Sequence, residues 1–160
     1  MQNITDTLTR ALQNKLQNLV SFLTQVTRGF DTIAEEIDHA SLRSAMRAIA
    51  VESKQYVKEI STQFPDFDST AASQHTDSIW KQIEGNVSEQ ASLEKGGEIV
   101  ALCNNCEVFF NKLYAEVLQE NLPAKNCKDI ISYQLYAINC ALMKVKLLNA
   151  VRFNQEVGSL

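Results

Sequence analysis

Hydrophobic residues near the start of the chain recur at alternating intervals of four and three. The series is Leu12, Leu16, Leu19, Leu23, Val26, Phe30, Ile33 and Ile37. This spacing is typical of a helix that buries one face over nearly four heptads. We predict that Thr5 or Asp6 caps the start of this helix and that Ser41 caps the next one, because short polar side chains accept the free backbone N–H groups there.

The same spacing returns in the second segment, with the inward positions Leu42, Met46, Ile49, Ser53, Tyr56, Ile60 and Gln63. Pro65 ends this segment, because the residue before a proline is pushed out of the helical region. Only about three residues separate the two segments, so they are predicted to form an antiparallel hairpin.

The crossover, residues 64–97, carries a weaker helical pattern. Its apolar residues at helical spacing are Ile79, Ile83 and Val87. Trp80 lies beside them and Gly85 interrupts the pattern, which predicts a short or kinked helix. We expect Trp80 to lie over one end of the molecule.

Two further amphipathic segments follow. The first extends from about Glu98 to Asn121 and has the inward residues Ile99, Cys103, Cys106, Phe110, Leu113 and Val117. Pro123 suits the first position of the second segment, where its missing N–H costs nothing. The inward residues of that segment are Cys127, Ile131, Gln134, Ile138, Ala141, Val145 and Leu148.

Together these segments predict an all-α protein, an antiparallel four-helix bundle with a short extra helix in the crossover between its second and third helices. We expect one domain over residues 1–160, with a core from about 12 to 152. The composition agrees, because only 5 glycines and 2 prolines leave few residues for tight turns.

Charge and hydropathy narrow the function. The net charge is −4 and the basic residues are scattered, which argues against a nucleic-acid partner. No apolar run approaches the ~18 residues that span a bilayer, so we expect no membrane partner. The N-terminal residues lack the basic and apolar regions of a secretory signal. We therefore expect a cytoplasmic protein whose 4 cysteines are not disulfide-bonded.

Several stretches, taken in order, resemble a bacterial family catalogued as domain of unknown function, family 2383. They are "GFDTIAEEI" (29–37), "SLRSAMRAIAVESKQYVKEI" (41–60), "SIWKQIEG" (78–85) and "NNCEVFFNKLYAEVLQENLPA" (104–124). The similarity covers about Leu16 to Leu148. It implies a ferritin-like four-helix bundle with no settled activity. Cys106 matches the family's Cys–acid step, whereas Cys103 has no counterpart there.

A ferritin-like bundle suggests a carboxylate-bridged iron or manganese site, built from inward Glu residues and two Glu-x-x-His motifs. The one such motif, Glu36 to His39, falls at the end of the first predicted helix. There we expect His39 to leave the helix. The acids nearest the inward positions are Glu52 and Glu107, which are the candidate ligands if Fe or Mn binds. Our leading expectation is no metal and no cofactor.

Cys103 and Cys106 form a Cys-x-x-Cys pair, which suggests a redox pair, half of a zinc site or ordinary core packing. Their heptad positions favour packing, because free cysteine behaves as a small apolar residue. Asn104, Asn105 and Glu107 are then expected to turn toward the flank and solvent. A thiol-based sensor that uses the two cysteines stays an alternative.

A secondary stripe formed by Tyr133, Tyr136 and Cys140 runs beside the inward positions of the last helix. Such a stripe either widens the core or forms a dimer surface. The leading hypothesis is a non-enzymatic module that binds a protein partner or associates with itself. A ferritin-like carboxylate metal protein and a thiol-based sensor are the alternatives, and no catalytic or cofactor-binding residue is predicted.

Overall fold

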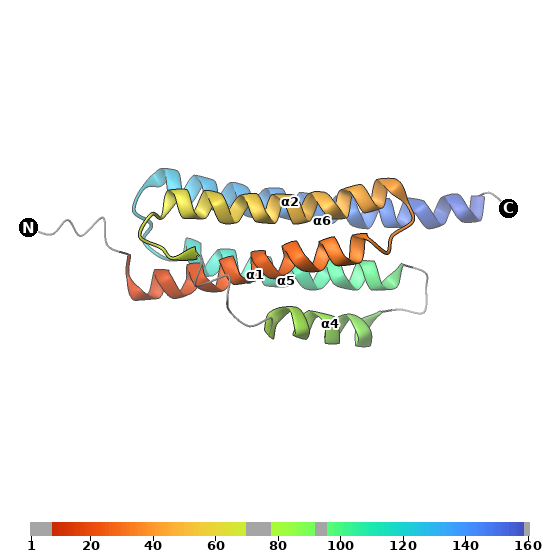
Figure 1. Ribbon diagram of the computed structural model, residues 1–160, viewed down its shortest axis with the longest axis horizontal. Coiled ribbons are helices and arrows are strands. Elements are labelled where there is room, and N and C mark those ends of the chain that lie inside the picture. The colour runs from red at the N-terminus through yellow and green to blue at the C-terminus, as the bar shows by residue number, and fades with distance from the viewer. Residues whose placement is uncertain (1–7, 70–77, 92–95, 159–160) are drawn as a thin grey trace, which may run out of the picture.

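The computed structural model describes residues 8–69, 78–91 and 96–158, and within them it contains five helices and no strand (Figure 1). The helices are α1 (Arg10–Ala34), α2 (Ala40–Gln63), α4 (Ser78–Gln90), α5 (Gly97–Leu118) and α6 (Lys125–Gly158). The prediction of an all-α fold is confirmed.

The four longest of these helices lie side by side, and α4 lies outside them along α1 and α5 (Figure 1). Helix α1 packs on α2 and α5, and α6 packs on the same two helices from the other side. The chain runs out along α1, back along α2, and then returns so that α5 has the direction of α2 (Figure 1). Neighbouring long helices are therefore antiparallel, and α6 extends past the others at its C-terminal end.

The core follows the predicted heptad positions closely. Six of the eight predicted residues of the first helix are buried in α1: Leu12, Leu16, Leu19, Leu23, Val26 and Phe30. All six predicted inward residues of α5 are buried, the two cysteines among them. The apolar side chains at this spacing face one interior because their helices present a single stripe to it.

The predicted helix starts were wrong at three places. Thr9 is the N-cap of α1, with its Oγ1 accepting the Leu12 N–H at 3.1 Å, whereas Thr5 and Asp6 lie outside the described residues. His39 rather than Ser41 caps α2, because its Nδ1 accepts the Leu42 N–H at 3.2 Å. Helix α6 begins two residues after Pro123. The sequence did not decide between neighbouring cap residues, because several polar side chains close together are able to cap the same turn.

Helix α4 continues through Gly85, and its Trp80 packs against the side of α1 rather than over an end of the molecule. The reason is Gly29 of α1, which has no side chain where the indole lies; a Cβ there would collide with the ring. The Trp80 ring is also edge-on to Phe30, with 6.2 Å between centroids.

Polar contacts also hold α4 against α1 and α5. The Trp80 backbone N–H donates to Gln25 Oε1 of α1 at 2.9 Å. Asn105 of α5, predicted to face solvent, is buried beneath α4 instead. Its Oδ1 accepts from Asn86 at 2.9 Å, and its Nδ2 donates to Gln90 at 3.0 Å. The prediction failed at Asn105 because the sequence did not indicate that α4 would lie over this side of α5.

Candidate functional site

The two cysteines of the Cys-x-x-Cys pair lie in the core between α5 and its neighbours. Cys103 and Cys106 have no exposed surface. Burial raises the pKa of Cys103 to about 12, and nearby Lys146 offsets only part of that increase. Burial also raises the pKa of Cys106, with Cys103 adding to it. Both groups are therefore held as thiols, and the thiolate is the form that attacks disulfides and binds metal.

The two candidate acids lie on different helices and have different neighbours. Glu52 of α2 is half-buried and accepts a hydrogen bond from the Tyr56 hydroxyl at 3.3 Å. Burial raises the pKa of Glu52, while that hydrogen bond and nearby Lys144 lower it. Glu107 of α5 is 3.7 Å from Lys146 Nζ of α6. Each acid thus faces a lysine of α6, one on each side of that helix.

Among residues 8–69, 78–91 and 96–158, no three His, Cys, Asp or Glu side chains come together in a group that could hold a metal ion. His39, the histidine of the Glu-x-x-His motif, uses Nδ1 to cap α2. In the described part of the chain, the acids and thiols suggested by the sequence are not brought to one place.

A buried polar network that the sequence analysis did not identify connects α5, α6 and α2. Tyr114 donates its hydroxyl hydrogen to Gln134 Oε1 at 2.9 Å. Gln134 Nε2 donates to Glu59 Oε1 at 3.0 Å and to the Tyr56 carbonyl at 3.4 Å. Burial raises the pKa of Tyr114 well above its ordinary value. Because each polar atom of Gln134 is used, the network links the packing of three helices.

Most of the large apolar side chains that are exposed in the described residues lie in a row on the outer face of α6, which we call the α6 stripe. Its members are Tyr133, Tyr136, Cys140, Met143, Leu147 and Val151. Tyr136 is 70% exposed and Leu147 is 59% exposed. The spacing is again three and four residues, on the side of α6 opposite its buried positions. The helix therefore carries two heptad faces, one in the core and one in solvent.

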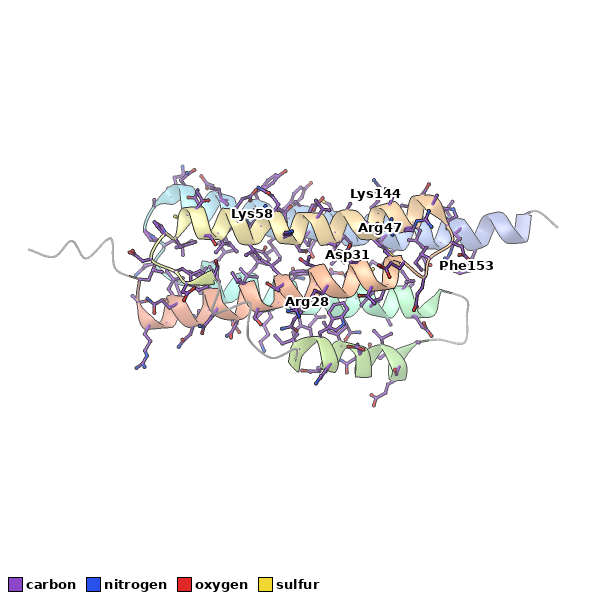
Figure 2. The ribbon with its side chains drawn as sticks, in the orientation of Figure 1. Arg28, Asp31, Arg47, Lys58, Lys144 and Phe153 are labelled. Atoms are coloured by element: carbon purple, nitrogen blue, oxygen red, sulfur yellow. The ribbon has the colours of Figure 1, made fainter. Side chains whose placement is uncertain are left out.

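A groove of about 350 Å³ lies between the α6 stripe and α2. Small side chains line much of it: Ala45 and Ala48 of α2, and Ala137 and Ala141 of α6. Tyr133, Tyr136 and Lys144, the last of which is labelled in Figure 2, also line the groove. A second groove of about 520 Å³ between the same two helices shares Tyr133. The stripe therefore borders two grooves that lie between α6 and α2.

Sequence reasoning identified the first half of the stripe and missed the second. Tyr133, Tyr136 and Cys140 were recognised, whereas Met143 and Leu147 were not. The signal was present, because the same three-and-four spacing continues through both. It was obscured by the inward series of α6, since nearly every turn of this helix carries apolar residues on two faces.

No helix in the described ranges combines the length and the apolar character needed to cross a membrane. Comparison with protein families, curated proteins and solved structures finds no match to this chain.

Proposed function

We propose that the protein is a four-helix bundle of the ferritin-like type that acts by contacting another protein chain and not by catalysis. Two features support the bundle. Each of α1, α2, α5 and α6 packs on two of the others, and a long crossover joins α2 to α5, which run in the same direction. One long crossover is the connection that distinguishes ferritin-like bundles from simple up-down bundles.

The α6 stripe is the observation that carries the functional part of the proposal. Large apolar side chains are scattered singly on most protein surfaces, whereas a contiguous row bordered by polar residues is typical of an interaction site. Tyrosine is also enriched at interfaces, because its ring supplies contact area and its hydroxyl tolerates water. Here two tyrosines, a methionine and a leucine follow one face of a single helix.

The interior supports the same proposal. The core thiols are held protonated, and the buried amide of Gln134 has no unused hydrogen-bonding atom. Both arrangements serve packing. We also propose that the chain is related to family 2383 and that it holds no resident cofactor. A cytoplasmic location, which suits unpaired thiols, is part of the same proposal.

Photo-crosslinking in the native cell tests the proposal. Tyr136 would be replaced by p-benzoylphenylalanine, with the same replacement at Gln82, an exposed residue of α4, as the matched control. We expect irradiation to link the residue at 136 to one protein species, whichever chain that is, and the residue at 82 to give no such product. Equal yields at the two positions, or no product at either, would refute the proposal.

A further inference from the structure

We propose that the chain covering the α6 stripe is a second copy of this protein, bound with its α6 antiparallel to the first. This inference rests on the proposed function, because it names the protein that the stripe contacts. Three properties of α6 support a second copy as the partner: the sizes of the stripe residues, the charges beside them and the apolar surface area of the stripe.

The stripe is complementary to itself in the antiparallel direction. A two-fold axis between Ala141 and Leu142 places Cys140 opposite Met143 of the second copy. The same axis sets Tyr136 opposite Leu147, and Tyr133 opposite Ala150, which is exposed. The largest side chains thus meet smaller ones, as knobs-into-holes packing requires. A symmetric dimer needs one surface patch that fits its own copy, and this patch does.

The charges beside the stripe also favour this alignment. Lys144 lies near Glu52, and Lys146 lies 3.7 Å from Glu107 and donates to Asn104 at 3.1 Å, all within the same chain. In the antiparallel pair Lys144 lies level with residue 139 of the second copy, so the two Lys144 side chains do not face each other. A parallel pair would set Lys144 of one copy level with Lys144 of the other. Antiparallel packing also opposes the two helix dipoles favourably.

The available area predicts a weak dimer. The stripe extends from Tyr133 to Val151, which is 19 residues and about 27 Å of helix. Its two tyrosines and its aliphatic residues offer on the order of 500 Å² of apolar surface per copy. That is less than the about 800 Å² per partner of a standard interface. We therefore expect reversible association in the micromolar range rather than a permanent dimer.

Engineered disulfides test the geometry. In a C140S background, the double variant Y136C/L147C is compared with the single variant Y136C after mild air oxidation of the purified protein. Antiparallel packing brings 136 of one copy against 147 of the other, so only the double variant should form a covalent dimer. Both positions are exposed, and circular dichroism verifies that the variants fold.

The unmodified chain gives a second measurement that does not depend on these substitutions. The two Cys140 Cα atoms would be roughly 10 Å apart, too far for a disulfide but within reach of a short bismaleimide. We expect that reagent to yield a dimer from wild type and none from a C140S/Q82C control.

The outcomes separate this inference from the proposed function. Dimerisation of Y136C alone would replace the antiparallel alignment with a parallel one. A strictly monomeric protein that gives no bismaleimide dimer would overturn the inference. If residue 136 still photo-crosslinks to a different protein in the cell, the proposed function stands without it. If it crosslinks to nothing, both fail.

Discussion

The two long sides of the molecule reverse the usual distribution of side chains, because one buries polar residues and the other exposes apolar residues. On the α1–α5 side, the surface beneath α4 includes the polar residues Gln25 and Asn105, and both are buried. On the α2–α6 side, tyrosine, methionine and leucine side chains face solvent. The side with polar residues is thus covered, and the side with apolar residues is open.

The difference shows what each side requires. Gln25 and Asn105 are hydrogen-bonded to α4 or to their own helices, so the cover of that side belongs to the chain itself. No helix in the described residues packs on the stripe, and burial of its side chains would be favourable. The proposed contact with another chain rests on this open apolar row.

Thiol reactivity should show the largest contrast between the two sides. Cys140 is exposed on α6, whereas Cys103 and Cys106 of α5 are buried. At pH 8 a thiol with a pKa of about 12 has on the order of a thousandfold less thiolate than an ordinary one. Maleimide labelling with peptide mass mapping should therefore modify Cys140 rapidly and the two core thiols only after denaturation. Rapid native labelling of Cys103 would contradict the burial described for α5.

The variant Gly29→Val should detach α4 from α1, because Trp80 of α4 packs against Gly29. The new side chain occupies the volume of the Trp80 ring, and overpacking of this kind costs about 1–3 kcal/mol. We expect a lower free energy of unfolding in urea and a red-shifted emission from Trp80, the chain's 1 tryptophan.

Gly85→Ala is the control for this substitution. A Cβ at Gly85 meets no atom within 4 Å, and the residue lies inside α4. Alanine there should stabilise the protein by about 0.5–1 kcal/mol with unchanged fluorescence. If both glycine variants shift the emission alike, the indole does not depend on the space at Gly29.

Asn105→Ala tests the polar part of the covered side. It removes hydrogen bonds to Asn86 and Gln90, so we expect a loss of about 1–2 kcal/mol and faster hydrogen exchange in α4. Asn104→Ala, one residue earlier and exposed, should change stability by less than about 0.5 kcal/mol. Equal effects of the two substitutions would argue against the burial of Asn105.

On the open side, Tyr136→Glu should have the smallest effect on stability. The residue is 70% exposed, so the monomer's free energy of unfolding should change by no more than about 0.5 kcal/mol. Chemical denaturation at low protein concentration measures this value. A loss of several kcal/mol would mean that Tyr136 is part of the core and not of a contact surface.

The heptad spacing predicted the helices and most of the core because burial of one stripe per helix is set by sequence alone. It did not predict where α4 would dock, since that depends on the gap at Gly29 and on amides far apart in the chain. The cap at His39 was missed because an imidazole nitrogen is an uncommon N-cap acceptor. The stripe was half predicted, because a second apolar face on a helix looks like a wider core until exposure is known.

Sedimentation equilibrium over a series of concentrations measures whether the α6 stripe joins two copies of the chain, with Tyr136→Glu and the α4 control Gln82→Glu measured beside wild type. We expect the apparent mass of wild type and of Gln82→Glu to rise from 17.9 kDa toward twice that value as concentration increases. Tyr136→Glu should remain at 17.9 kDa throughout. A wild-type mass that stays monomeric into the high micromolar range, or a Tyr136→Glu variant that dimerises like wild type, would mean that the α6 stripe does not join two copies of the chain.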